Sequence, residues 1–269
     1  MPSAPNPTTD HALVLESAVD PEALRAEVRL KYAEVATNPG GAFHFQTGRP
    51  LAARLGYPAE ICAGLPDSAI ASFAGVDNPF TAGPVAVGSH VLDLGSGGGF
   101  DCFVAAELVG PAGAVVGVDM TPEMLSRSRR EAARLGLRNV EFRDGILEDL
   151  PVDDEWADVV IGNGVLNLVA DKVLVLQEAY RVLRPGGVLQ FADIAVGATL
   201  PAEARCDIDL WTDCIAGGLS VDGWVAAITA AGFGSVAIGL PTDSFGGAAG
   251  EARARAHQVT GHTFRAIKP

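Results

Sequence analysis

An α/β fold is predicted for this chain: a Rossmann-like, mostly parallel seven-stranded sheet with helices on both faces and an N-terminal helical cover. Two observations predict it. From residue 89 onward, short apolar stretches typical of buried strands alternate with stretches of helical pattern, and strands joined through helices form parallel sheets with right-handed crossovers. Apolar residues make up 48% of the 269 positions, enough to bury a core of that size.

The composition narrows the range of partners. Lys and Arg number 19 against 33 Asp and Glu, so the net charge is −14. Nucleic acid and anionic membranes are disfavoured because phosphate binding needs clustered cations, which leaves a small-molecule substrate. No window approaches about 18 uninterrupted apolar residues, and the first residues lack the pattern of a signal peptide, so a cytoplasmic location is expected. The expected oligomeric state is a monomer or a homodimer.

In the first part of the chain, the sequence pattern predicts a loose segment over residues 1–20 and a helical cover that contacts the substrate over residues 21–85. A helix is expected over 21–37, since Asp20 can cap it and Pro21 suits its first position. The Gly and Pro content then predicts loops over 38–50 and 74–80, with a short helix from Leu51 to near Gly56 between them.

Residues 86–198 form the predicted core, and residues 199–269 the C-terminal helices and edge strands that complete the sheet and the substrate pocket. In the core, Thr121 is expected to cap a helix that Gly136 ends. Strands are expected at 90–95, 114–120, 140–145, 157–168 and 188–194, and helices at 100–110, 121–136 and 171–187. Residues 200–235 are expected to be helical, and 235–243 and 262–269 to form an antiparallel edge pair.

The stretch HVLDLGSGGGFDC places a glycine loop directly after the first core strand. Gly95 and Gly97 fit the dinucleotide pattern G-x-G-x-x-G, but Phe100 stands at its third glycine, and the loop lacks the Lys of a phosphate-binding P-loop. Asp119 closes the second strand, where an acid can bind both ribose hydroxyls, and Asp93 can meet an ammonium group. A purely structural turn is the competing interpretation. The pattern favours a nucleoside with a cationic amino-acid part and no phosphates, which S-adenosylmethionine fits.

Longer stretches carry a resemblance to a known family. VLDLGSGGGFDCFVAAELVGPAGAVVGVDMTPEML, VEFRDGILEDLPV and VLNLVADKVLVLQEAYRVLRPGGVLQFADI resemble class I S-adenosylmethionine-dependent methyltransferases. Over about residues 30–235 the chain is similar to the arsenite methyltransferase branch, because GSGGGFDCF, VGPAG and DLWTDCIAG occur together. The resemblance implies S-adenosyl-L-methionine as the cofactor and S-adenosyl-L-homocysteine as its product.

The same resemblance implies a set of cofactor contacts. Asp119 would hold the ribose, and Tyr32 would cover the bound cofactor. Ile146 stands where many relatives carry an acid for the adenine amino group, so the adenine is expected to depend on backbone groups near Ile146 and Leu147, and on Asp144. The full set is Tyr32, Asp93, Gly95, Ser96, Gly97, Asp119, Met120, Gly145, Ile146, Leu147 and Asn163.

The departures from the family concern the substrate. Arsenite methyltransferases bind trivalent arsenic through thiolates, and the resemblance places those thiols at Val76, Gly164 and Cys214 of this chain. One thiolate cannot chelate arsenic firmly, so a changed acceptor is expected, and Gly164 would leave room for a bulkier one. Of the other cysteines, Cys102 is expected to fill apolar space, whereas Cys62 and Cys206 match no family ligand.

Segments outside the predicted sheet supply the candidate groups for the substrate. His44 lies among aromatics where a lid is expected, and Arg49 can clamp a carboxylate or phosphate. The competing interpretations are a packed structural group for His44, a capped turn for Asp77 and Asn78, and one polar helix face for Asp213 and Cys214. The candidates for catalysis are His44, Asp77, Asp213 and Cys214, and those for substrate contact are Arg49, Gln46, Asn78, Gly164 and Trp211; no metal is expected.

The predicted function is transfer of a methyl group to a small organic acceptor. Methyl transfer from a sulfonium is an in-line displacement, which chiefly requires alignment of the acceptor and exclusion of water. Methylation of arsenite with a reduced set of thiols is the first alternative. A cofactor-binding protein without turnover is the second.

Overall fold

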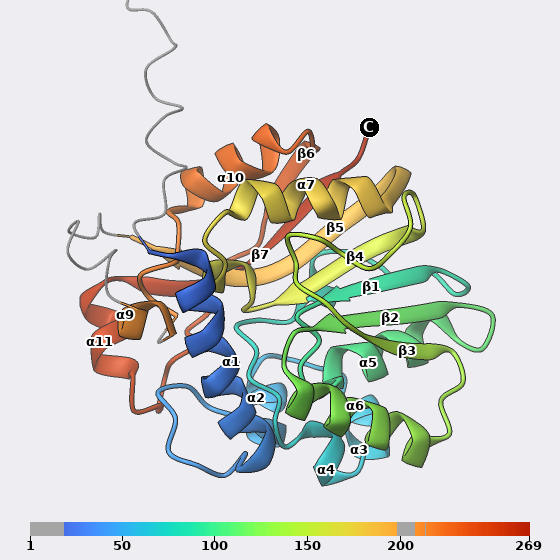
Figure 1. Ribbon diagram of the computed structural model, residues 1–269, viewed down its shortest axis with the longest axis horizontal. Helices are drawn as coiled ribbons and strands as arrows, with labels where there is room; N and C mark the ends of the chain where they lie inside the picture. Colours follow the sequence, from blue (N-terminus) through green and yellow to red (C-terminus); the bar gives the residue numbers. More distant parts are fainter. Residues whose placement is uncertain (1–18, 198–207, 213) are drawn as a thin grey trace, which may run out of the picture.

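The computed structural model describes residues 19–197, 208–212 and 214–269. Its centre is a seven-stranded sheet of order β3-β2-β1-β4-β5-β7-β6 (Figure 1). The five strands from β3 to β5 pair in parallel, β7 pairs antiparallel with β5, and β6 pairs antiparallel with β7. This arrangement confirms the predicted α/β class. Asp213, Cys206 and most of the predicted loose segment lie outside the described residues.

The elements follow the predicted alternation. The strands are β1 (His90–Leu94), β2 (Ala114–Asp119), β3 (Val140–Asp144), β4 (Ala157–Asn163), β5 (Leu183–Val196), β6 (Gly234–Ile238) and β7 (Val259–Ile267). The helices are α1 (Pro21–Thr37), α2 (Gly48–Arg54), α3 (Ala59–Gly64), α4 (Asp67–Ile70), α5 (Phe100–Val109), α6 (Pro122–Leu135), α7 (Lys172–Val182), α9 (Ile208–Thr212), α10 (Val221–Ala230) and α11 (Glu251–Ala256). Two single 3₁₀ turns complete the described elements: η2 (Pro79–Thr81) precedes β1, and η3 (Leu166–Leu168) follows β4.

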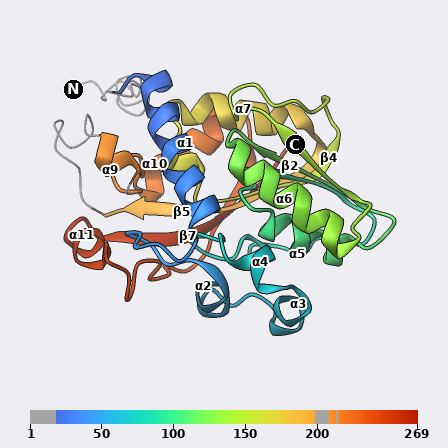
Figure 2. The same ribbon diagram turned by 60° about the horizontal axis from the view of Figure 1, so that its bottom comes forward.

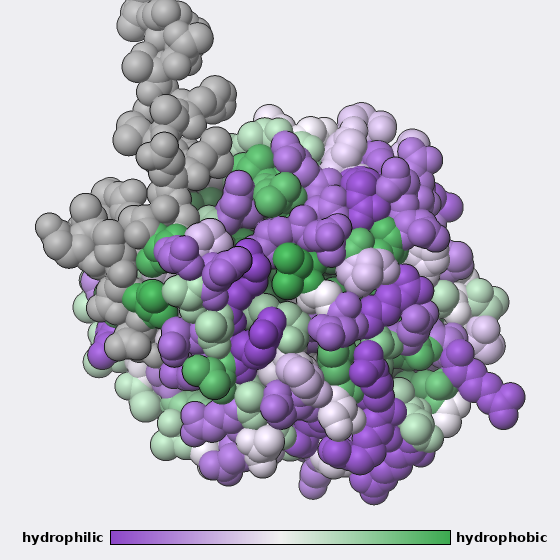
Figure 3. Space-filling model, in the orientation of Figure 1, coloured by the Kyte–Doolittle hydropathy of each residue, from purple (hydrophilic) through white to green (hydrophobic). Residues whose placement is uncertain are grey.

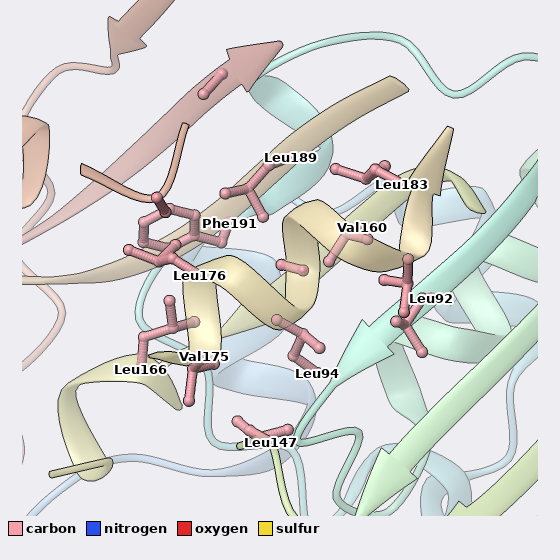
Figure 4. Close-up of a cluster of buried hydrophobic side chains, with 14 of the residues drawn as sticks. Leu92, Leu94, Leu147, Val160, Leu166, Val175, Leu176, Leu183, Leu189 and Phe191 are labelled. Atoms are coloured by element: carbon pink, nitrogen blue, oxygen red, sulfur yellow. The ribbon is translucent and has the colours of Figure 1, made fainter. Parts of the chain in front are cut away.

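Helices cover both faces of the sheet because successive side chains of each strand point to opposite faces. Leu92 packs in the cluster that α7 and α10 cover, whereas its neighbour Val91 packs against α5 and α6. Figure 4 shows the first cluster, with Val175 and Leu176 of α7 facing the strand residues. Both faces are therefore dry, and polar side chains concentrate at the ends of the strands.

The helix ends confirm some of the predicted signals and correct others. The Asp20 side chain caps α1 by accepting the N–H of Ala23 at 2.8 Å, and α6 ends at Gly136 in the left-handed conformation. Thr121 stands at the start of α6 but does not cap it, since its N–H and hydroxyl both bond the Asp119 carboxylate. The predicted helix over 171–187 is wrong at its end: the chain leaves the helix after Val182 and enters β5.

Short helices form a platform beside α5. Figure 2 shows α2, α3 and α4 side by side at the same end of the molecule as α5, and their apolar side chains pack with Phe100 and Val104 of α5. Neither α3 nor α4 is predicted by the sequence pattern, because six-residue and four-residue helices show no periodicity. The helix α2 begins at Gly48 rather than at the predicted Leu51.

The surface is mixed in character. Figure 3 shows hydrophilic residues over most of one face, with apolar residues scattered among them. Within the described ranges, no helix combines the length and the hydropathy that a bilayer crossing requires.

Candidate active site

A cleft opens at the carboxyl ends of the parallel strands, beside α1. Its empty space, including the open mouth, amounts to about 990 Å³. Ligands of open α/β sheets bind at this edge. Its walls come from α1, from residues 72–75 and from the loops after β1, β2, β3 and β4. The lining includes the full predicted set of cofactor contacts, without Asp144, together with Gly164. Residues that the sequence analysis missed include Arg25, Val28, Ser72, Phe73, Asp101, Thr121, Met124 and Glu148.

The glycine loop after β1 and the acid after β2 meet in this cleft. Gly95 adopts a φ of 62°, and a Cβ there would collide with the side chain of Val165, so only glycine fits. The Asp119 carboxylate accepts the N–H of Gly97 and the N–H of Thr121, each at 2.8 Å. Burial raises the pKa of Asp119, and these hydrogen bonds oppose that rise. The two predicted halves of the nucleoside site are therefore in direct contact.

Two buried acids, Asp93 and Asp101, line the cleft. Asp101, on the first turn of α5, accepts the Tyr57 hydroxyl at 2.6 Å and the Asn163 amide at 3.1 Å. Burial raises the pKa of Asp101 to about 6. Burial, and secondarily the Asp101 charge, raise the pKa of Asp93 well above its ordinary value. The signal in the sequence that could have pointed to Asp101 is an acid two positions after Gly99, the last glycine of the loop.

The Cys102 side chain is buried, as expected of an apolar filler, but it also serves as a donor. Its thiol donates to the Asp93 carboxylate across 3.2 Å. Burial and the Asp93 charge raise the pKa of this thiol well above its ordinary value, so it stays a neutral donor. Cys62 is buried among the short helices, outside the cleft.

Asn163 ties the floor of the cleft to the loop over 74–80. Its carbonyl oxygen accepts the N–H of Val76 at 2.7 Å, and its amide donates to the carbonyl of Asp77 at 2.8 Å and to the Tyr57 hydroxyl at 3.0 Å. With the bond to Asp101, one side chain joins four groups from three segments of the chain. Asn163 therefore fixes where the loop stands relative to the cofactor-binding loops.

Asp77 and Asn78 maintain the shape of that loop and do not line the cleft. The Asp77 carboxylate accepts the Thr242 hydroxyl at 2.8 Å and the N–H of Asn78 at 2.7 Å. The Asn78 side chain accepts the N–H of Phe80 at 3.0 Å and donates to a backbone carbonyl of Gly56 at 3.2 Å. These bonds favour the capped-turn interpretation over a role in catalysis.

Tyr32 lines the cleft, whereas Cys214 is buried beside it and is not part of the lining. The Tyr32 hydroxyl is hydrogen-bonded to the Cys214 thiol, and burial raises the pKa of the tyrosine well above 10. Cys214 itself adopts a left-handed φ of 57°. Gly164 is also left-handed, and a Cβ there would lie 2.9 Å from a methyl group of Val76. Val76 thus partly fills the space beside Gly164. This corrects the prediction that Gly164 leaves room for a bulkier acceptor.

The other candidate substrate residues lie away from the cleft. Arg49 donates to the Asp67 carboxylate and to the carbonyls of Cys62 and Leu65, so its guanidinium is committed to the short helices. Gln46 donates to the Gly246 carbonyl at 3.1 Å. His44 lines a separate cavity with Phe43, Phe245 and Arg253 among others. Trp211 is buried with the Lys172 ammonium 4.7 Å above its ring, and burial lowers the pKa of that lysine to about 8.

The cleft lining that includes Ile146 also holds an ion pair. The guanidinium of Arg25 on α1 lies 3.6 Å from the carboxylate of Glu148, and both residues line the cleft. Asp144 is exposed at the end of β3 and is not part of the lining, which argues against its expected contact with adenine.

Comparisons with known proteins agree with this geometry. A family model described as "Methyltransferase domain" matches residues 86–232. An arsenite methyltransferase of Halobacterium salinarum is 43% identical over 239 residues, which are 84% of this chain and 61% of the relative. The arsenite methyltransferase of Homo sapiens is 43% identical over 138 residues, 48% of this chain and 37% of the relative. The chain thus spans less than two thirds of either relative.

Solved structures show the same fold. An arsenic(III) S-adenosylmethionine methyltransferase from Chlamydomonas reinhardtii is 32% identical, with a TM-score of 0.59 over 82% of this chain and 73% of that one. A second structure is a phosphoethanolamine N-methyltransferase of Haemonchus contortus, solved with S-adenosylhomocysteine. Its TM-score is 0.60 at 17% identity, and the match covers 71% of this chain and 51% of that one. At that identity the second likeness concerns the fold alone.

Proposed function

Since the chain belongs to the class I S-adenosylmethionine-dependent methyltransferases, and resembles arsenite methyltransferases within them, we propose that it methylates a small organic acceptor by in-line displacement. One observation carries the choice of acceptor. Of the three positions where the resemblance places arsenic-binding thiols, Val76 and Gly164 carry none, and Val76 fills the space beside Gly164. Trivalent arsenic prefers several thiolates, and Cys214 alone is a weak site.

The residues of the cleft fit S-adenosylmethionine. Asp119 is placed to accept the ribose hydroxyls, and the left-handed glycine loop lets a ligand lie against its backbone. The buried hydroxyls of Ser72 and Ser96 make no hydrogen bond within the described part of the chain, so a bound ligand can satisfy them. The cofactor, when bound, supplies an electrophilic methyl group on a sulfonium.

The chain's own contribution is orientation and exclusion of water. Tyr32 on α1 and the loop held by Asn163 wall off the side where an acceptor must approach. The raised pKa of Tyr32 keeps its hydroxyl protonated at neutral pH, so it serves as a hydrogen-bond donor and not as a general base. Alignment of two reactants in a dry site is enough to accelerate a displacement strongly.

Methylation of arsenite is the second candidate, because the named relatives share it and because the Cys214 thiol is hydrogen-bonded to Tyr32, which lines the cleft. A cofactor-binding protein without turnover is the third. Labelled S-adenosylmethionine separates the third from the others, since only an enzyme transfers the label to an acceptor.

The deciding experiment compares the wild type, Cys214→Ser and Val76→Cys. Mass spectrometry would follow methylated arsenic formed from arsenite and excess thiol, and label transfer to a panel of amines, thiols, phenols and carboxylic acids. We expect the wild type to label an organic acceptor and to form little methylated arsenic, and Val76→Cys, with a second thiol, to bind arsenite more tightly. Rapid arsenite methylation that Cys214→Ser abolishes would overturn the proposal.

A further inference from the structure

We propose that Asp101 and Ser72 form the amino-acid end of the cofactor site, where Asp101 binds the α-ammonium group beside Asp93 and Ser72 binds the α-carboxylate. The inference rests on the use of S-adenosylmethionine proposed above. It assigns cofactor contacts to a residue of α5 and to one that precedes the core altogether.

Charge supports the assignment of the ammonium group. Asp93 and Asp101 are 2% and 6% exposed, both line the cleft, and neither forms an ion pair within the described ranges. The groups that face them are neutral donors, the Cys102 thiol, the Tyr57 hydroxyl and the Asn163 amide, together with a third acid, Asp119. Buried carboxylates are normally paired with a cation. An ammonium group brought by the ligand supplies that cation.

An independent observation supports the assignment of the carboxylate. Ser72 is 4% exposed and lines the same cleft, yet its hydroxyl has no hydrogen-bond partner within the described part of the chain. This hydroxyl stands directly against Gly98, where a Cβ would overlap it. Buried hydroxyls nearly always find a partner. A hydroxyl that meets the glycine loop from outside the core is suited to donate to an acidic oxygen of a ligand in that loop.

The assignment connects the two halves of the reaction. The two oxygens of Asp101 accept Tyr57 and Asn163, and Asn163 in turn holds the backbone of Val76 and Asp77. An ammonium group at Asp101 therefore touches the network that positions the acceptor-facing loop. Asp101 is a cofactor contact, whereas Tyr57 is a positioning residue that acts through it.

Two ligands separate a contact from a structural role. S-Adenosylhomocysteine carries the ammonium and carboxylate groups, and 5′-methylthioadenosine carries neither but keeps the nucleoside. By calorimetry at pH 7.5, we expect Asp101→Asn to weaken S-adenosylhomocysteine binding about tenfold or more and Ser72→Ala about threefold to tenfold, as for lost charge-assisted bonds. Both variants should bind 5′-methylthioadenosine within about twofold of the wild type. Ser128→Ala is the control, because that buried hydroxyl bonds only the Leu125 carbonyl.

Each other outcome is informative. Equal weakening of both ligands in Asp101→Asn and Ser72→Ala would overturn the inference in favour of a structural role. Should Asp101→Asn fail to fold, as thermal melts would reveal, the selectivity of Ser72→Ala decides by the same criterion. A wild type that binds both ligands equally would overturn the inference alone, whereas a wild type that binds neither would overturn the proposed function as well.

Discussion

The donor half and the acceptor half of this cleft are assembled in different ways. The donor half consists of the loops that directly follow β1, β2 and β3, so each loop is positioned by the strand before it. The proposed acceptor half joins Tyr32, with Cys214 bonded behind it, and the loop over 74–80, which is anchored by a bond between Asp77 and Thr242, 165 positions apart. A half built from separate segments can change residue by residue while the donor half is kept, which fits the proposed change of acceptor.

The largest effect is expected for Asp119→Ala, which removes the acid of the donor half. Two ribose hydroxyls lose a charged acceptor, and each such bond contributes about 1.5–3 kcal/mol, so S-adenosylhomocysteine should bind at least about 100-fold more weakly by calorimetry. Asp144→Ala is the matched control, an acid at the end of the neighbouring strand in register with Asp119 but outside the cleft. Comparable losses in both variants would contradict the assignment of Asp119.

The same contrast, between loops positioned by the preceding strand and segments joined by distant contacts, decides how much of the molecule the sequence predicts. The glycine loop, Asp119 and the alternation of strands and helices are local patterns, and the structure places them as expected. Asp101 was within reach of prediction, since it stands two positions after the last glycine of the loop. Ser72, and the roles of Asp77 and Asn78, depend on contacts across 22 to 165 positions that no local pattern encodes.

The next largest effect is expected for a substitution of Asn163, which connects the two halves of the cleft. Asn163→Ala removes one side chain that bonds Val76, Asp77, Tyr57 and Asp101. Because buried partners are left unsatisfied, the free energy of unfolding should fall by about 2–3 kcal/mol in urea titrations. Hydrogen exchange of the amides in the loop over 74–80 should become faster.

Asn139→Ala provides the comparison for Asn163→Ala. Its amide makes a single bond to the Gly110 carbonyl at 3.0 Å, and its loss should cost about 1 kcal/mol. If Asn163→Ala proves no more destabilising than Asn139→Ala, the two halves are not coupled through Asn163.

A smaller effect is expected from pH, through the acids of the donor half. Burial raises the pKa of Asp101 to about 6, from an unfolded value near 3.8, so the ligand-free protein takes up a proton on this group as pH falls below 6. An ammonium group binds only the ionised acid, and affinity for S-adenosylhomocysteine should therefore fall about tenfold from pH 7.5 to pH 5. The same raised pKa makes the ligand-free fold lose stability as pH rises from about 4 to 6.

Two comparisons isolate Asp101 in that titration. The Asp101→Asn variant should show a flatter dependence, while Asp93, Asp119 and the Cys102 thiol remain to titrate nearby. Asp193 also has a pKa raised to about 6, but it bonds Asn167, interacts with Lys172 and does not line the cleft. An unchanged pH profile in Asp101→Asn would assign the titration to one of these other acids.

The smallest effect concerns Arg49, which lies outside both halves. Its guanidinium bonds Asp67 and two backbone carbonyls of the short helices, so Arg49→Ala should lower the free energy of unfolding by about 1 kcal/mol and leave cofactor affinity unchanged. Asp67→Ala should cost less, because its side chain is 91% exposed and ion pairs there contribute little. If Arg49→Ala instead raised KM for the acceptor without a loss of stability, the acceptor half would extend to α2, and the arginine would bind an anionic group of the substrate as its sequence context suggested.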